Sequence, residues 1–234
     1  MTTCILLAGG LGTRLRSALP GLPKCLAPVA DRPFLQVQLA QLSSQGMERF
    51  ILALGHLAGQ VIEVARELRH SFALEWLVEP RPLGTGGAAL FAMHHAALSE
   101  AVIANADTFL RADLGALIAP LDGDREEIRM LAVRADNASR FGRVVVDGGK
   151  AKAFMPRGSS RSGLVNAGIY RVHRSALAKY RPGQTFSLEA DVIEALAARG
   201  KVAAAVVPGT LTDIGVPNDY VRFCRSEEAK CSAL

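Results

Sequence analysis

Short apolar runs alternate with amphipathic stretches along the whole chain. Apolar runs bounded by glycine, proline or polar residues are typical of buried strands. These runs predict strands over Cys4–Leu7, Arg49–Leu54, Ala73–Val78, Ala101–Ala106, Arg129–Val133, Val144–Asp147, Val165–Val172 and Val202–Val207. Strands separated by segments of helical length indicate a largely parallel sheet.

The amphipathic stretches lie between these strands and predict the helices. They cover Phe34–Gln45, Leu57–Arg69, Thr85–Ala97, Ser187–Ala198 and Pro217–Arg225. Pro33 and Pro217 stand at two expected helix starts, where a first turn tolerates proline. The pattern therefore predicts an α/β fold that is Rossmann-like, with three α/β/α layers around a mostly parallel mixed sheet.

The chain reads as one domain. Its 234 residues are enough to bury a full core and few enough for a single unit, so we expect one domain over residues 1–234. No repeat, linker or low-complexity run divides it. The stretch Ala135–Arg161 is richer in glycine, serine and charge, and we expect a small β-rich insertion there.

Three loops follow predicted strands and carry the polar residues of interest. They are Ala8–Pro28, Glu79–Gly87 and Asp107–Phe109. Ligands of such sheets lie beyond the carboxyl ends of the strands. We therefore expect the three loops to converge on one cleft.

The first loop is rich in glycine. It reads Ala8-Gly9-Gly10-Leu11-Gly12-Thr13-Arg14-Leu15 and is followed by Pro23-Lys24. Glycines let the backbone bend sharply and expose its N–H groups, which can wrap a polyphosphate together with Arg14 and Lys24. A dinucleotide fingerprint is excluded because Leu15 stands where its last glycine belongs, and a P-loop is excluded because no Gly-Lys-Ser/Thr ends the loop.

The run from Leu7 to Leu15, together with Pro23-Lys24, resembles the signature of the sugar-1-phosphate nucleotidylyltransferases. Enzymes of that family join an NTP to a sugar 1-phosphate and release pyrophosphate. The resemblance continues in order along almost the whole chain. It is strongest to the branch that uses GTP and D-glycero-D-manno-heptose 1-phosphate to make GDP-heptose for capsule or surface polysaccharides.

The resemblance implies a nucleotide site built largely from the glycine loop. Arg14 and Lys24 are the expected catalytic cations, since both reactants are anions and the reaction needs charge neutralisation and alignment. The expected nucleotide-binding residues are Leu7, Ala8, Gly9, Gly10, Gly12, Thr13, Arg14, Lys24, Glu79, Gly84, Thr85 and Asp107.

Two carboxylates are candidates for holding Mg²⁺. Asp107 directly follows a predicted apolar strand, where a carboxylate can reach a magnesium ion that is also held by phosphates. Asp213, in Thr212-Asp213-Ile214-Gly215, matches the second magnesium-binding carboxylate of the family. Considered alone, Asp213 is equally well explained as a turn or helix-capping residue.

Base recognition is expected from the loop Glu79–Gly87. An ionised Glu79 can only accept hydrogen bonds, and guanine offers N1–H and an exocyclic amine together. This favours GTP. The alternative is that Glu79 is solvated and that the backbone alone reads the base.

The resemblance also implies a sugar-phosphate site. Its expected residues are Asn105, Arg157, Asn166, Gly168 and Glu189, and the β-rich insertion is expected to close over the sugar. Many relatives carry Glu-Lys where this chain has Pro156-Arg157, so the role of Arg157 is open. Glu189 has an alternative reading as a first-turn helix residue paired with Ser187.

Charge and composition exclude other classes of protein. The net charge of +5 comes from 27 Lys and Arg against 22 Asp and Glu, and the basic residues are scattered, so no nucleic-acid partner is expected. No apolar run reaches membrane-spanning length and no signal peptide is recognisable, so we expect a cytoplasmic protein without a membrane partner. The four cysteines share no metal-ligand spacing. A homodimer is compatible with the sequence, which reveals no interface.

Three alternatives remain open at the level of sequence. In the first alternative, the acceptor is mannose 1-phosphate, or another sugar 1-phosphate that reacts with UTP or dTTP, instead of heptose 1-phosphate. In a different class, the chain is an inactive subunit that senses nucleotide sugars, against which the retained Arg14, Lys24, Asp107 and Asp213 argue. An NAD-linked oxidoreductase is the most distant alternative, because Leu15 breaks the fingerprint.

Overall fold

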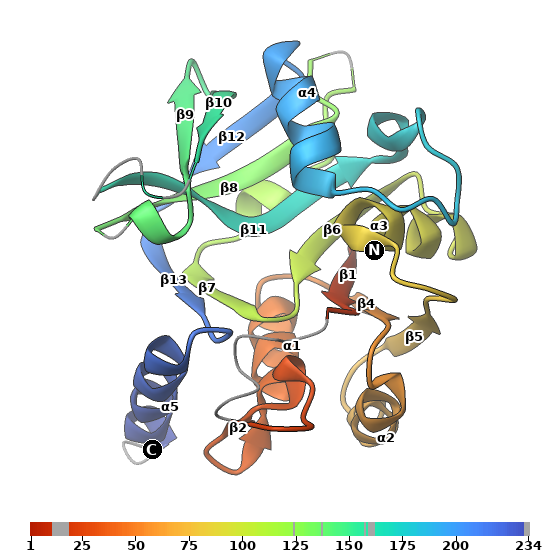
Figure 1. Ribbon diagram of the computed structural model, residues 1–234, viewed down its shortest axis with the longest axis vertical. Helices are drawn as coiled ribbons and strands as arrows, with labels where there is room; N and C mark the ends of the chain where they lie inside the picture. The colour runs from red at the N-terminus through yellow and green to blue at the C-terminus, as the bar shows by residue number, and fades with distance from the viewer. Residues whose placement is uncertain (11–18, 124, 137, 157, 159–161, 232–234) are drawn as a thin grey trace.

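A nine-stranded mixed sheet runs through the computed structural model (Figure 1). The structure describes residues 1–10, 19–123, 125–136, 138–156, 158 and 162–231. In spatial order, the strands of the sheet are β5 (Leu74–Val78), β4 (Arg49–Leu54), β1 (Thr3–Ala8), β6 (Glu100–Asn105), β11 (Gly163–His173), β8 (Ile128–Ala135), β12 (Val202–Val206), β10 (Lys150–Met155) and β9 (Arg143–Asp147).

Helices lie on both sides of this sheet. They are α1 (Phe34–Ser44), α2 (Ala58–Leu68), α3 (Gly84–His95), α4 (Glu194–Ala198) and α5 (Pro217–Cys231), with 3-10 turns over Lys24–Leu26, Gly115–Leu117, Ala138–Arg140 and Arg174–Leu177 and a π-helix over Leu188–Ile193. No helix in the described residues is long and apolar enough to cross a membrane.

Strand β4 shows how the apolar pattern buries both faces of the sheet. Phe50, Leu52 and Leu54 belong to a core shared with α1 and α2. Ile51 and Ala53 belong to a second core shared with α3 and α4. Successive strand side chains point to opposite faces, so a strand covered on both faces reads as a continuous apolar run. The predicted three-layer α/β fold is confirmed.

The order of the parallel strands reverses at β1. This strand pairs in parallel with β4 on one side and with β6 on the other, and β5 continues beyond β4. Strand β11 is antiparallel to both β6 and β8, which makes the sheet mixed. Open α/β sheets bind ligands where the strand order reverses, at the carboxyl ends of the strands. The loops after β1 and β6 therefore flank the expected site.

Two short antiparallel ribbons were not predicted. β7 (Thr108–Ala112) pairs with β13 (Gly209–Asp213), and β2 (Pro28–Val29) pairs with β3 (Arg32–Pro33). The prediction that Asp107–Phe109 is a loop was wrong beyond Asp107, because Thr108 already belongs to a strand. The partner strand comes from the far end of the chain, so no local pattern reveals this pairing.

The predicted β-rich insertion is confirmed as a hairpin of β9 and β10. It continues the main sheet, since Lys150 pairs with Ala203 of β12 and Arg143 pairs with Val165 of β11. The prediction of one regular helix over Ser187–Ala198 was wrong in detail, because the segment starts as a π-helix before α4.

Helix α5 is held against the β7–β13 ribbon by an aromatic cluster. The ring centroids of Phe109 and Phe223 are 4.9 Å apart, and Phe34 of α1 lies 5.6 Å from Phe223. Ile214 is fully buried in the same cluster. This packing fixes the chain on both sides of Asp213.

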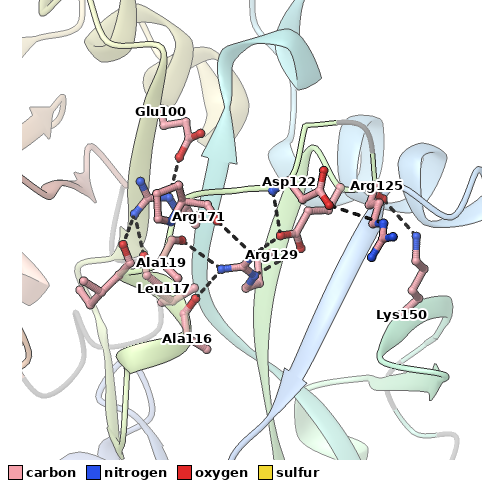
Figure 2. A network of polar contacts seen from close by, with 12 residues as sticks. Glu100, Ala116, Leu117, Ala119, Asp122, Arg125, Arg129, Lys150 and Arg171 are labelled. Carbon is pink, nitrogen blue, oxygen red and sulfur yellow. Dashed lines mark hydrogen bonds and ion pairs between the residues drawn. The ribbon is translucent and has the colours of Figure 1, made fainter.

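Two arginines fix the connection between β7 and β8 (Figure 2). Arg129 and Arg171 are direct partners in the β8–β11 pairing. Like charges opposite each other destabilise a sheet unless they are neutralised; here Glu126 pairs with Arg129 and Glu100 pairs with Arg171. Both guanidinium groups also donate to backbone carbonyls of residues 116–119 at 2.8–3.0 Å. These hydrogen bonds hold the segment between β7 and β8 against the sheet.

Candidate active site

A cavity of about 840 Å³ opens at the carboxyl ends of β1, β4, β5 and β6. Its volume suits a large polar ligand. Every predicted site residue that the structure describes lines this cavity, namely Leu7, Ala8, Gly9, Gly10, Lys24, Glu79, Gly84, Thr85, Asn105, Asp107, Asn166, Gly168, Glu189 and Asp213. Predictions for Gly12, Thr13, Arg14 and Arg157 lie outside the described residues. The expected convergence of the loops on one cleft is confirmed for the described part.

Lys24 and Asp107 form an ion pair in this cavity. The Nζ of Lys24 donates to Oδ2 of Asp107 at 2.8 Å, and both side chains are partly buried. Pro23, in extended conformation, leads into the short helical turn that starts at Lys24. A Cβ atom on Gly215 would lie 2.8 Å from both the Lys24 Nζ and Oδ1 of Asp213, so a side chain there would shift the ends of these two side chains. The lysine is therefore placed beside both predicted metal-binding carboxylates.

The β7–β13 ribbon brings Asp107 and Asp213 together. Asp213 pairs with Thr108 in register, and the Ile214 N–H donates to the Asp107 carbonyl at 3.0 Å. The Oδ1 of Asp213 accepts the Gly215 N–H at 2.9 Å. In the described residues, no three His, Cys, Asp or Glu side chains group as metal ligands. Two carboxylates suit Mg²⁺, which takes few protein ligands when waters and phosphate oxygens complete its shell.

Glu79 is anchored over the glycine turn that follows β1. Its Oε2 accepts the Leu83 N–H at 2.9 Å. Its Oε1 faces Gly9 so closely that a Cβ there would lie 2.6 Å away, so a side chain at position 9 would displace the Glu79 carboxylate. Burial raises the pKa of Glu79 above its ordinary value, and the Leu83 N–H partly offsets this effect. Glu79 is thus a fixed acceptor in the cavity wall.

Three hydroxyl groups surround the carboxylate of Glu189. Thr85 Oγ1 donates to Oε2 at 2.7 Å, and Ser187 Oγ approaches the same oxygen at 3.2 Å. The Tyr170 hydroxyl lies 3.3 Å from Oε1. The pairing of Glu189 with Ser187, weighed as an alternative from the sequence, is present. It does not remove Glu189 from the cavity.

Comparison with known proteins identifies the family. The nucleotidyl transferase family matches residues 3–230. The chain belongs to this family. The resemblance of its opening motif to the sugar-1-phosphate nucleotidylyltransferases is thereby confirmed, and the protein is a nucleotidyltransferase.

Individual relatives of this transferase cover nearly its full length. It is 31% identical to a D-glycero-alpha-D-manno-heptose 1-phosphate guanylyltransferase of Campylobacter jejuni, over 94% of this chain and 97% of the relative. It is 29% identical to the enzyme of the same name from Aneurinibacillus thermoaerophilus, over 92% of this chain and 94% of the relative. The crystal structure of HddC from Yersinia pseudotuberculosis superposes with a TM-score of 0.83 at 28% identity, covering 97% of this chain and 99% of that one. HddC in complex with GMP-PN superposes with a TM-score of 0.79, at 27% identity and the same coverage.

Several residues that line the cavity of the transferase were not among the predicted site residues, and two of them carry polar groups next to that site, Arg140 and Tyr170. The guanidinium of Arg140 grips both carboxylate oxygens of Asp219, at 3.0 and 2.5 Å, and this hydrogen bonding raises the pKa of Arg140. The second is the hydroxyl-bearing Tyr170 of β11. A single arginine in a connecting segment carries no pattern, and Tyr170 occupies an apolar strand where an aromatic ring reads as core.

The cavity of the transferase also contains a cysteine, Cys25. Burial raises the pKa of its thiol to about 12. Because the thiolate is the nucleophilic form, the raised pKa lowers the nucleophilicity of this cysteine at neutral pH. The raised pKa therefore disfavours covalent catalysis through Cys25.

Proposed function

We propose that this nucleotidyltransferase transfers GMP from GTP to D-glycero-D-manno-heptose 1-phosphate, giving GDP-heptose and pyrophosphate. The observation that carries the proposal is the cluster of Lys24, Asp107 and Asp213 in the wall of the cavity. The similarity to heptose 1-phosphate guanylyltransferases over more than nine-tenths of the chain supports the choice of sugar and nucleotide. Surface polysaccharide assembly is the class of process that consumes such a product.

The reaction joins two anions. An oxygen of the sugar phosphate attacks the α-phosphorus of GTP, a new P–O bond forms, and the bond to the β-phosphate breaks with its electron pair leaving on pyrophosphate. Positive charge and alignment are the main requirements. The Lys24 ammonium supplies charge beside the two carboxylates, and Arg140 adds a guanidinium that is fixed by Asp219. Arg14 remains the predicted cation for the departing phosphates.

Asp107 and Asp213 would hold Mg²⁺. Their placement at one end of the β7–β13 ribbon, with Asp107 directly before β7 and Asp213 as the last residue of β13, supports this assignment. When bound, the ion would neutralise charge on the phosphate groups and bring the two reactants to one place. The carboxylates supply the negative charge that makes this position attractive to a divalent cation, and Lys24 balances Asp107 in the protein described here.

Glu79 supports guanine as the base. A carboxylate that is already anchored by the Leu83 N–H keeps acceptor positions for a base edge that donates. Guanine donates through N1–H and its exocyclic amine side by side, whereas uracil and thymine present a single N3–H between two carbonyl oxygens. The complex of the related HddC with GMP-PN is consistent with a guanine nucleotide here.

The fate of a labelled phosphate tests the proposal. With GTP labelled at the α-phosphate and heptose 1-phosphate as acceptor, we expect the label in a sugar nucleotide whose mass equals that of GDP-heptose. Label that remains in GTP, or that appears only in free GMP or GDP, would contradict the proposed transfer. Mannose 1-phosphate as the acceptor in a parallel reaction checks the choice of sugar.

A further inference from the structure

One chain of hydrogen bonds connects the loop assigned to the nucleotide with the segment assigned to the sugar. It starts at Thr85, in the first turn of α3, and passes to the Glu189 carboxylate. It continues through the Tyr170 hydroxyl to the side chain of Asn166 in β11. All four side chains line the cavity. The two subsites therefore share a single polar network.

The hydroxyl of Tyr170 has no proton available to donate to a substrate. Its ring is fully buried, with 1% of the residue exposed. Its hydroxyl accepts from Asn166 Nδ2 at 2.7 Å and donates to Glu189 Oε1 at 3.3 Å. Burial raises the pKa of Tyr170 well above its ordinary value, so the phenol keeps its proton. A phenol has one proton to donate, and here Glu189 receives it.

The hydroxyl of Thr85 is likewise used in hydrogen bonds to other protein groups. Its hydroxyl proton goes to Glu189 Oε2 at 2.7 Å, and its oxygen accepts the Leu188 N–H at 2.9 Å. Although Thr85 lies in the loop assigned to the nucleotide, its side chain hydrogen-bonds to the helix that carries Glu189. The side chain of Thr85 therefore acts on the position of Glu189.

The unused bonding capacity of Glu189 defines what it can bind. A carboxylate oxygen accepts about two hydrogen bonds. Oε2 is filled by Thr85 and Ser187, and Oε1 receives Tyr170. Among the residues that the structure describes, no other group fills the remaining acceptor position on Oε1. Asn166 uses its Oδ1 for the Gly168 N–H at 3.0 Å and one N–H for Tyr170, which leaves its second N–H. One acceptor and one donor suit a sugar hydroxyl and its neighbour.

We propose that Tyr170 and Thr85 are positioning residues, which fix Glu189 as the acceptor for a hydroxyl group of the sugar phosphate. The inference rests on the proposed function. Neither residue needs to touch the substrate, because both act through the Glu189 carboxylate. The network predicts that damage to either residue affects the sugar phosphate and spares GTP, even though Thr85 lies in the nucleotide loop.

Initial-rate kinetics on Tyr170→Phe and Thr85→Val test this inference. Both substitutions keep the shape of the side chain and remove its hydroxyl. We expect the KM for the sugar phosphate to rise about tenfold, as for the loss of one hydrogen bond to a charged group, with the KM for GTP within about twofold of wild type. Tyr180→Phe is the matched control, because its hydroxyl donates to the Asp191 carbonyl outside this network and its ring stacks on Phe186. It should leave both constants unchanged.

The outcomes separate the two proposals. A wild-type enzyme that releases no pyrophosphate with any sugar phosphate and GTP would remove the proposed function. A working wild type whose KM for sugar phosphate is unchanged in Tyr170→Phe would overturn the positioning role alone. An equal rise in both KM values would also overturn it, since that pattern indicates general structural damage. If Tyr170→Phe does not fold, Thr85→Val decides by the same criteria.

Discussion

The Lys24 Nζ lies 2.8 Å from Oδ2 of Asp107, which joins the expected catalytic cation to a carboxylate expected to hold the metal. The contact bridges 83 positions of the sequence. In the proposed reaction, it places a positive charge where the two phosphate groups approach each other. Removal of either partner should therefore affect the chemical step more than the fold.

Lys24→Ala should lower kcat by at least about 100-fold, because it removes charge that stabilises the transition state. The measurement is the rate of pyrophosphate release at saturating substrates. Thermal unfolding serves as the control and should change little, since Asp107 stays partly open to solvent. A variant that retains near-normal turnover would remove Lys24 from the mechanism.

Asp107→Asn and Asp213→Asn should each weaken the binding of divalent cation. Each substitution removes a negative charge from a pair that we expect to hold Mg²⁺. Binding of Mn²⁺ as a spectroscopic probe should weaken about tenfold or more, with the folded state retained. Equal Mn²⁺ affinity in wild type and both variants would show that these carboxylates hold no metal.

Glu79→Gln should reduce the preference for GTP over other nucleotides. The amide offers a donor where guanine also donates, so kcat/KM for GTP should fall while that for UTP falls less. Competition between the two nucleotides in one reaction measures the ratio directly. An unchanged ratio would assign base recognition to the backbone of residues 80–87.

Ionisation of Glu79 should also contribute to the pH dependence of stability. Burial raises its pKa above the ordinary value of 4.5, so the folded protein binds this proton more tightly than the unfolded chain. Ionisation of Glu79 therefore lowers stability as the pH rises through the window above 4.5. The melting temperature of Glu79→Gln relative to wild type should rise across that window. A difference that is flat or falls with pH would contradict the buried carboxylate.

Much of the fold follows from local patterns, because the buried parallel strands are continuous apolar runs. Arg49–Leu54 is found with the predicted bounds. The β7–β13 ribbon escaped prediction because its pairing depends on contacts far apart in sequence. The same dependence on distant contacts explains which residues of the site could not be predicted. The glycine loop, Lys24 and Asp107 follow local patterns or a family motif, whereas the pairing of Arg140 with Asp219 and of Tyr170 with Glu189 exists only after folding.

The measurement that tests the central claim most directly is kcat/KM for pyrophosphate release with Mg²⁺, across GTP, ATP, UTP, CTP and dTTP, each paired with heptose, mannose and glucose 1-phosphates. The account predicts the highest value for GTP with heptose 1-phosphate. A higher value for any other nucleotide, or for GTP with another sugar, would contradict the assignment of the substrate. A folded protein that releases no pyrophosphate with any pair would contradict the proposed reaction.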